Sequence, residues 1–297
     1  MATNSKNTRE VELKLALAED GSEALATHAL LDSLPCRRQQ LTNTYFDTPE
    51  GILENARMAL RLRQVDGRTL QTLKTSGKGG GGMSERGEWE WEVPAGQLDL
   101  DGLSALPVMQ GWKSSALERL APRLQTNFTR TTWQLDASGS SMEVALDQGE
   151  IRAGSHRANI HEAELELVKG DPQALWTVAL SLAEAIRLRP ADMSKAARGN
   201  ALLQQHWALP EAETPAQWLH RATVALDAYH DSTDGYFLRA SHEALRELAH
   251  HQALDRKERQ LAERLISQLG DNGEFSAAFG QAALKLSRHM ACKTMLS

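Results

Sequence analysis

Four short stretches of the chain place charged residues at every second position, and this alternation limits what the chain can fold into. They are Glu10–Lys14, Arg61–Arg63, Arg86–Glu92 and Glu162–Leu167. Side chains of a β-strand alternate between two faces, so each stretch predicts a strand with one ionic face and one apolar face. If such strands close with the ionic face inward, the lumen holds carboxylates and basic groups together. A polyphosphate with bound divalent cations would match such a lumen.

A second interpretation of the same alternation is the solvated face of a half-buried antiparallel sheet, with opposite charges paired across strands. Two details weigh against it. Like charges repeat within each stretch, which costs stability in water unless something bridges them. Trp89 and Trp91 also mark the opposite face of their strand as buried.

The composition of the 297 residues restricts the class of protein. The formal net charge of −6 argues against a general binder of nucleic acid or of anionic membranes. Only Cys36 and Cys292 occur, which favours a reducing compartment. The first residues are polar, and no apolar run is long enough to span a membrane. We therefore expect a cytoplasmic protein with no nucleic-acid or membrane partner; the sequence leaves the oligomeric state open.

Roughly eight strands are expected in the first part of the chain, enough to close a small barrel. Their predicted ranges are Glu10–Leu17, Leu41–Asp47, Met58–Val65, Arg68–Lys74, a strand ending at Val93, Thr126–Ala137, Ser141–Asp147, Glu150–Ala153 and Glu162–Val168. Gln148-Gly149 is expected to be a hairpin turn. Helices are predicted at Ser22–Ser33, Leu98–Leu106, Ser115–Leu124 and Asp171–Ile186.

The glycine run Gly77–Gly82 does not fit the G-x-x-x-x-G-K-[ST] phosphate loop, and it leads into a strand instead of a helix. We expect it to form a mobile hairpin loop that moves over a bound substrate.

A change in composition predicts a domain boundary. Residues 1–205 are expected to form the tunnel domain, 206–215 a linker rich in Pro and Glu, and 216–297 a helical domain. Helices are predicted over Thr214–Ala253 and Asp255–Leu269, and again from Phe275. The predicted fold class is thus α+β, with an eight-stranded antiparallel closed β-tunnel and flanking helices, followed by a small all-α C-terminal domain. A chain ending near His206 should fold by itself if few contacts cross the linker.

The charged motifs, in this order, resemble those of the CYTH superfamily, the triphosphate tunnel metalloenzymes. The resemblance rests on Glu10-x-Glu12-x-Lys14, Arg61-x-Arg63, Lys74, Arg86-x-Glu88-x-Glu90, Arg130, Asp147, Glu162-x-Glu164-x-Glu166 and Ser194-Lys195-x-x-Arg198-Gly199. Ala145–Glu150 and Ser194–Gly199 are especially similar to bacterial inorganic triphosphatases, in which a helical CHAD domain follows the CYTH domain. The region after residue 213 is short for a CHAD domain and lacks its arginine-rich helix, so we expect a truncated or diverged CHAD-like region.

This resemblance implies roles for the charged residues. The implied catalytic residues are Lys14, Glu10, Glu12, Glu164 and Glu166. The implied ligands of Mg²⁺ or Mn²⁺ are Glu10, Glu12, Asp147, Glu162, Glu164 and Glu166. The implied phosphate-binding residues are Lys14, Arg61, Arg63, Lys74, Arg86, Arg130, Arg152 and Lys195. Arg152 is included because Thr132 stands where related chains often carry a Lys.

The activity that the resemblance implies is metal-dependent hydrolysis of inorganic triphosphate to pyrophosphate and phosphate. A nucleoside or thiamine triphosphatase, or an adenylate cyclase, would use the same fold with a pocket for a ring system at the tunnel mouth. A non-catalytic polyphosphate-binding protein is an alternative from another class, although binding an anion needs no carboxylates.

Overall fold

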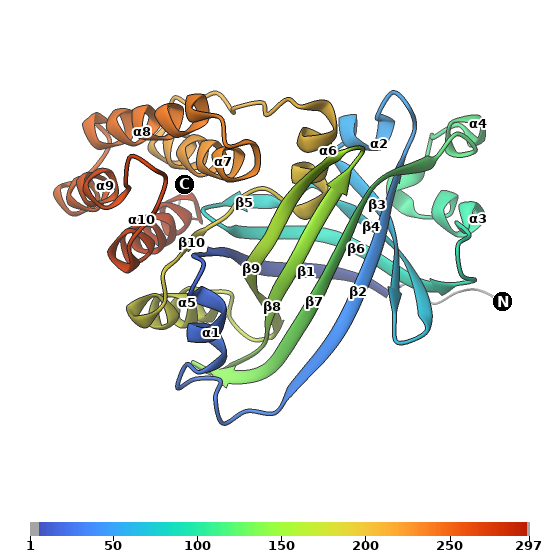
Figure 1. The fold of residues 1–297 in the computed structure, drawn as a ribbon, viewed down its shortest axis with the longest axis horizontal. Coiled ribbons are helices and arrows are strands. Elements are labelled where there is room, and N and C mark those ends of the chain that lie inside the picture. Colours follow the sequence, from blue (N-terminus) through green and yellow to red (C-terminus); the bar gives the residue numbers. More distant parts are fainter. Residues whose placement is uncertain (1–5, 296–297) are drawn as a thin grey trace.

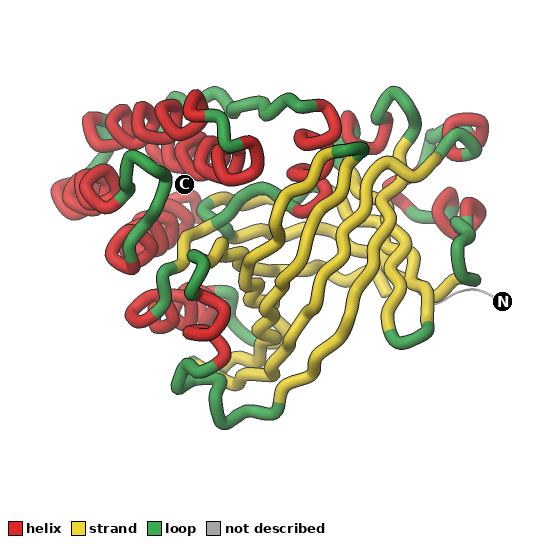
Figure 2. The backbone as a smooth tube through the Cα atoms, in the orientation of Figure 1, coloured by secondary structure: helices red, strands yellow, loops and turns green. Residues whose placement is uncertain are grey.

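The computed structural model describes residues 6–295, and its strands form one antiparallel sheet that closes on itself. Eight strands make the closed barrel, in this order around it: β1 (Lys6–Leu17), β9 (His156–Lys169), β8 (Ser140–Ala153), β7 (Ala121–Ala137), β2 (Cys36–Asp47), β3 (Met58–Val65), β4 (Arg68–Thr75) and β6 (Met83–Val93). Pairing of β1 with β6 closes the ring. Two short strands, β10 (Leu188–Pro190) and β5 (Lys78–Gly80), extend its edges. The curved strands are visible in Figure 2.

Short helices cover the apolar outer faces of these strands. They are α1 (Gly21–Ala26), α2 (Ile52–Asn55), α3 (Leu100–Ser104), the 3₁₀ turn η1 (Pro107–Met109), α4 (Ser114–Leu117) and α5 (Gln173–Ala185). Helix α6 (Lys195–Gln204) instead packs on lumen-facing apolar positions, among them Leu124, Phe128 and Ile151. Trp89 and Trp91 are buried in one cluster with Leu103 of α3, as the alternation predicted. Trp176 of α5 is buried in a second cluster, against β1 and β9. The charged alternate positions therefore face the lumen.

Several predicted boundaries were wrong. The turn expected at Gln148-Gly149 lies inside β8, which runs unbroken from Ser140 to Ala153. A Cβ on Gly149 would lie 2.1 Å from the carbonyl oxygen of Asn127, so this glycine lets β7 and β8 pass closely. The helix predicted over Ser115–Leu124 ends at Leu117, because the chain enters β7 at Ala121.

Four longer helices follow the barrel: α7 (Pro215–Ser232), α8 (Gly235–His250), α9 (Arg256–Gln268) and α10 (Ala277–Met295). The single helix predicted over Thr214–Ala253 breaks at Thr233, which has a left-handed φ of 57°, and Asp234 then caps α8. A capping box of Thr214 and Gln217 begins α7. Across the described residues, none of the helices has both the length and the apolar character needed to cross a membrane.

The helical region packs closely on the barrel, beside β10 and α5 (Figure 1). A Cβ on Gly280 of α10 would lie 1.9 Å from the carbonyl oxygen of Leu188. Leu284 is fully buried in the cluster that contains Leu13 and Trp176. The expectation that few contacts cross the 206–215 segment is therefore not met, while the domain boundaries themselves stay a prediction.

The glycine run is also held by other parts of the chain. Lys14 N–H donates to the Gly82 carbonyl at 2.9 Å, and Gly82 N–H donates to Asp192 Oδ1 at 2.6 Å. Gly81 has a φ of 65°, and a Cβ there would lie 2.2 Å from Ser287 Oγ of α10. In place of a free loop, the structure shows a β5–β6 turn anchored to the barrel and to α10.

Gly81→Ala should destabilise the protein, because it combines a left-handed backbone with a clash against α10. We expect the free energy of unfolding to fall by about 2 kcal/mol. Gly80→Ala is the matched control in the same turn, since a Cβ there meets nothing within 4 Å. Urea unfolding of both variants checks the prediction; equal stability of the two would show that the turn does not dock on α10.

Candidate active site

The ionic face of the barrel encloses a cavity of about 1140 Å³. The strand register sets which groups meet there. Glu166 of β9 lies between two acidic neighbours, Glu143 of β8 and Glu12 of β1. On the other side of Glu12 lies Ser84 of β6. One strand position further along this face, Glu164 lies opposite Lys14. An acidic row and a more basic region therefore lie side by side in one lumen.

The acidic row contains a carboxyl group without a cationic partner. Among the described residues, Glu166 forms no salt bridge, although Lys74 exerts some attraction. Burial and the nearby Glu10, Glu88 and Glu12 raise the pKa of Glu166 to about 7. Ionisation of Glu166 therefore calls for a cation that the ion pairs of the acidic row do not supply.

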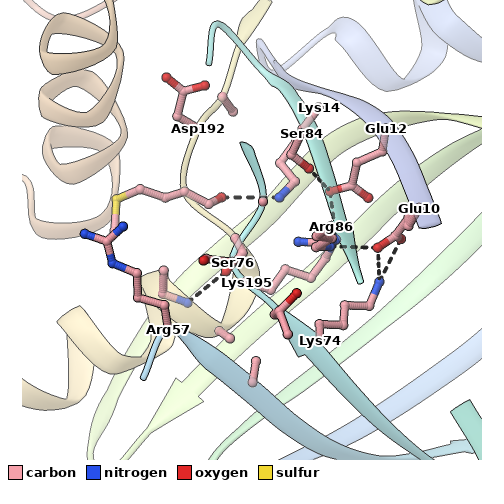
Figure 3. A pocket seen from close by; sticks show the side chains of 18 of the residues that line it. Glu10, Glu12, Lys14, Arg57, Lys74, Ser76, Ser84, Arg86, Asp192 and Lys195 are labelled. Atoms are coloured by element: carbon pink, nitrogen blue, oxygen red, sulfur yellow. Dashed lines mark hydrogen bonds and ion pairs between the residues drawn. The ribbon is translucent and has the colours of Figure 1, made fainter. Parts of the chain in front are cut away.

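Two basic residues hold the rest of the acidic side in place (Figure 3). Arg86 donates through Nε to Glu10 Oε2 at 2.7 Å and through Nη2 to Glu12 Oε1 at 2.8 Å. Lys74 Nζ lies 2.7 Å from Glu10 Oε1 and 3.2 Å from Glu88 Oε1. Burial alone raises the pKa of Glu10, but Lys74 and Arg86 outweigh it and hold that pKa far below its usual range.

On the basic side, two cations besides the exposed Arg57 lack a carboxylate partner among the described ion pairs. Arg63 donates through Nε to the amide oxygen of Asn43 at 2.8 Å, and Lys14 donates to the Met193 carbonyl at 3.4 Å. Burial, together with Arg61 and Arg130, lowers the pKa of Arg63 to about 9. A buried guanidinium beside other cations is a site prepared for an anion.

The same cations also lower the pKa of the neighbouring Tyr45 hydroxyl. Burial alone raises the pKa of its hydroxyl, but Arg61, Arg63 and Lys195 outweigh burial and lower that pKa.

A third group of carboxylates is already satisfied by cations. Lys195 Nζ lies 2.7 Å from Asp147 Oδ2 and 3.0 Å from Glu164 Oε1, and it also contacts Glu162. Both oxygens of Asp147 accept from Arg130, at 2.7 and 2.6 Å. These three carboxylates lie close enough to hold an ion, but the Lys195 ammonium occupies that position. In this structure Asp147 and Glu162 hold cations of the chain itself, and their predicted role as metal ligands stays a prediction.

The cavity brings together most of the predicted site residues. Lining it are Glu10, Glu12, Lys14, Arg61, Arg63, Lys74, Arg86, Arg130, Glu164, Glu166 and Lys195. Three predicted residues do not line it. Asp147 and Glu162 are buried and pair with Lys195. The Arg152 side chain is 45% exposed and pairs with Glu150. On β8 the even-numbered position places Arg152 on the face opposite Asp147, so the prediction that it binds phosphate in the lumen was wrong.

Sequence reasoning missed Glu143, Tyr45, Asn43 and Ser84. Glu143, Tyr45 and Ser84 line the cavity, and Asn43 is fully buried, with its amide bonded to Thr126 at 2.9 Å. Glu143 carried a usable signal, because it lies four residues before Asp147 and thus on the same strand face. The other three are neutral, so a search for alternating charge passes over them.

Comparison with known proteins agrees with this geometry. Residues 8–199 match the family model described as the CYTH domain. The chain belongs to the CYTH domain family. A Haemophilus influenzae protein named inorganic triphosphatase is 34% identical over 195 residues, which are 65% of this chain and 55% of that protein. The chain thus spans about half the length of this curated relative.

One solved structure shows the same fold for the CYTH domain. A Hippeastrum protein, described as an adenylyl cyclase with a dominant triphosphatase activity, matches with a TM-score of 0.52 and 20% identity, covering 65% of this chain and 95% of that one. A Pyrococcus horikoshii protein has a TM-score of 0.43 and 19% identity, covering 66% and 99%. At this identity the Hippeastrum likeness supports the fold alone.

The raised pKa of Glu166 predicts a pH-dependent change in stability when a chelator removes metal. Because the folded state keeps this proton more tightly than the unfolded chain, the stability of the wild type falls as pH rises from 4.5 to about 7. Glu166→Gln removes that loss, so above pH 7 the variant should be more stable than the wild type by on the order of 2 kcal/mol.

Urea unfolding near pH 5 and near pH 8 measures this difference. The exposed Glu247 of α8 supplies the control variant, Glu247→Gln, for which no such pH dependence is expected. If Glu166→Gln showed the same gap from wild type at both pH values, Glu166 would not be an uncompensated carboxyl group.

Proposed function

We propose that this chain hydrolyses inorganic triphosphate to pyrophosphate and phosphate inside its barrel, with Mg²⁺ or Mn²⁺. The observation that carries the proposal is that one cavity holds both an acidic row, in which Glu166 has no ion pair among the described residues, and the basic residues Arg63 and Lys14, which have no carboxylate partner. Neither half is fully neutralised by the chain itself. A triphosphate together with a divalent ion supplies both missing charges. The similarity to the Haemophilus inorganic triphosphatase over the CYTH domain supports the same substrate.

The acidic row fits a hard divalent ion. Carboxylate oxygens are the ligands that Mg²⁺ and Mn²⁺ prefer, and the half-buried Glu166 forms no ion pair among the described residues. We assign Glu12 and Glu166 as principal ligands, with Glu10 beside them and Glu143 as an added candidate. When bound, such an ion neutralises phosphate oxygens and activates water.

The chain's own cations position the phosphates. We assign Arg63 and Lys14 as direct phosphate ligands, because their donors are least satisfied by the protein. Arg130 and Lys195, each held by Asp147, present a fixed positive surface beside them. Phosphoryl transfer depends mainly on positioning and on charge neutralisation, so a rigid array of donors is what the reaction needs. Arg61 and Tyr45 complete the basic side. For Glu164, we propose that it holds Arg130 and Lys195 in place instead of acting as a catalytic residue.

Larger triphosphate substrates are less well matched. Among the described cavity-lining residues Tyr45 is the sole Phe, Tyr or Trp, and it lies beside Arg61 with its side chain buried. The cavity therefore offers little for stacking a nucleobase or a thiamine ring. A purely polyphosphate-binding role leaves the acidic row unexplained. We further propose a cytoplasmic enzyme without a nucleic-acid partner, with the tunnel domain over 1–205 and a CHAD-like helical region over 216–297.

The full chain should release phosphate from tripolyphosphate in the presence of Mg²⁺ or Mn²⁺, faster than from ATP. Ca²⁺ should support little activity, because it takes a larger and looser ligand shell than Mg²⁺. Phosphate release from a panel of tripolyphosphate, ATP and thiamine triphosphate measures this preference. Equal rates on ATP would overturn the choice of substrate, and full activity with Ca²⁺ alone would contradict the metal assignment.

Arg63→Ala and Arg152→Ala form a matched pair, since both delete an arginine from a barrel strand. Arg63→Ala should raise KM for tripolyphosphate by tenfold or more, on the order expected for losing a charged hydrogen bond to phosphate. Arg152→Ala should leave KM and kcat unchanged, because its side chain lies outside the cavity. Steady-state kinetics with circular dichroism as a check of folding tests both. A larger effect at Arg152 would reverse the facing assigned to β8.

A further inference from the structure

The segment that joins β10 to α6 and the first residue of α6 each contribute one group to the basic side of the cavity. Lys195 begins α6, directly after its N-cap Ser194, whose hydroxyl accepts from Ala197 N–H at 3.1 Å. The Met193 carbonyl accepts from Lys14 Nζ. Both Met193 and Lys195 line the cavity. The placement of this segment therefore sets where two of the lumen's cations lie.

Helix α7, from the helical region, holds the backbone of that segment through Asp227. This carboxylate is 5% exposed, and its Oδ2 accepts the N–H groups of Asp192 at 3.2 Å and Met193 at 3.3 Å. Its Oδ1 accepts from Arg189 Nη1 at 2.6 Å. One buried side chain of α7 thus fixes the chain immediately before Lys195.

Four residues further along the same face of α7, Asp231 reaches the lumen through a chain of ion pairs. Asp231 accepts from Arg198 Nε at 2.9 Å and from Arg198 Nη2 at 2.6 Å. Arg198 Nη1 lies 3.4 Å from Glu162 Oε2, and the other oxygen of Glu162 accepts from Lys195. Asp231 is therefore linked to Lys195 through two intermediate side chains.

A further connection joins α7 to the glycine turn. Asp192 accepts from Gly82 N–H through Oδ1, and its Oδ2 lies 2.6 Å from His220 Nδ1 of α7. His220 also lines the cavity. The helical region thus contributes to the cavity wall as well as to its support.

From these contacts, and resting on the proposed function, we infer that α7 is a working part of the active site. Asp227 and Asp231 are positioning residues: neither lines the cavity, and both act through Lys195 and the Met193 carbonyl. A buried ion pair contributes little net stability compared with apolar packing. Their structural effect is instead to fix where the phosphate-binding cations lie. A helical module that merely follows the barrel would not need them.

The test measures binding of tripolyphosphate to the full-length chain by calorimetry, in the presence of chelator so that no hydrolysis occurs. In Asp231→Asn, Arg198 keeps Glu162 as its remaining carboxylate partner and draws it away from Lys195. We expect affinity to fall by about tenfold, within the range known for mutations that act through an intervening network. Asp227→Asn should weaken binding similarly, and Asp231→Glu, which keeps the charge, should bind with intermediate affinity. Glu247→Gln on α8 is the matched surface control and should bind like wild type.

A second comparison separates positioning from loss of stability. Leu265→Ala removes a fully buried side chain of α9 without touching the ion-pair chain, so it should lower Tm while leaving affinity for tripolyphosphate unchanged at temperatures where it is folded. Wild-type affinity in folded Asp231→Asn and Asp227→Asn would overturn the inference, as would an equal loss in Leu265→Ala. Should Asp231→Asn not fold, unchanged affinity in Asp231→Glu would overturn the inference.

The inference and the proposed function can fail separately. A wild-type chain that binds tripolyphosphate without hydrolysing it would contradict the proposed function, while the Asp231 comparison would still decide this inference.

Discussion

The structure depends on one constraint, which is that a lumen crowded with charge must be held shut by apolar packing on the outside. A closed ring of strands meets it by sending alternate residues to opposite sides. The Leu, Val and Trp positions pack against α3, α5 and neighbouring turns, while the Glu, Arg and Lys positions contact one another and a few polar groups of the chain. The outer packing can therefore stabilise charges that repel one another inside.

Inside the lumen, charged groups differ in whether the protein has already provided a partner. Arg130 and Lys195 both pair with Asp147, and both also pair with Glu164, so the fold itself fixes their positions. Glu166 and Arg63 have no such partner, and their pKa values are displaced toward the neutral form by burial and by like charges. The presence or absence of an ion pair thus distinguishes residues that shape the site from residues that are available to bind a ligand.

Much of this arrangement follows from the sequence, because a period of two is a strong signal when charge and Trp alternate. The strands at Met58–Val65 and Arg68–Lys74, the buried Trp pair and the lumen side of Glu10, Glu12 and Arg86 were predicted for that reason. The failures have a common cause. Arg152 was assigned without checking its strand parity against Asp147, and the turn placed at Gly149 ignored that glycine also serves where two strands approach closely.

What the sequence could not predict is the role of α7, since nothing in the spacing of Asp227 and Asp231 indicates which arginines they meet. Such pairings arise only when distant segments pack together.

The position of β1 has a consequence for how the chain acquires its structure. One edge of β1 pairs with β9, while its other edge is shared between β6 at Lys6–Leu13 and β10 at Leu15–Leu17. Among the barrel strands β1 comes earliest in the sequence and β9 latest, so the ring cannot close until β9, which ends at Lys169, is available, and β10 near residue 190 then completes the second edge of β1. Folding then rests on contacts between distant parts of the sequence, which are slow to form. Until then Glu10, Glu12 and Lys14 remain in water, so this highly charged strand can wait for its partners without exposing a continuous apolar edge.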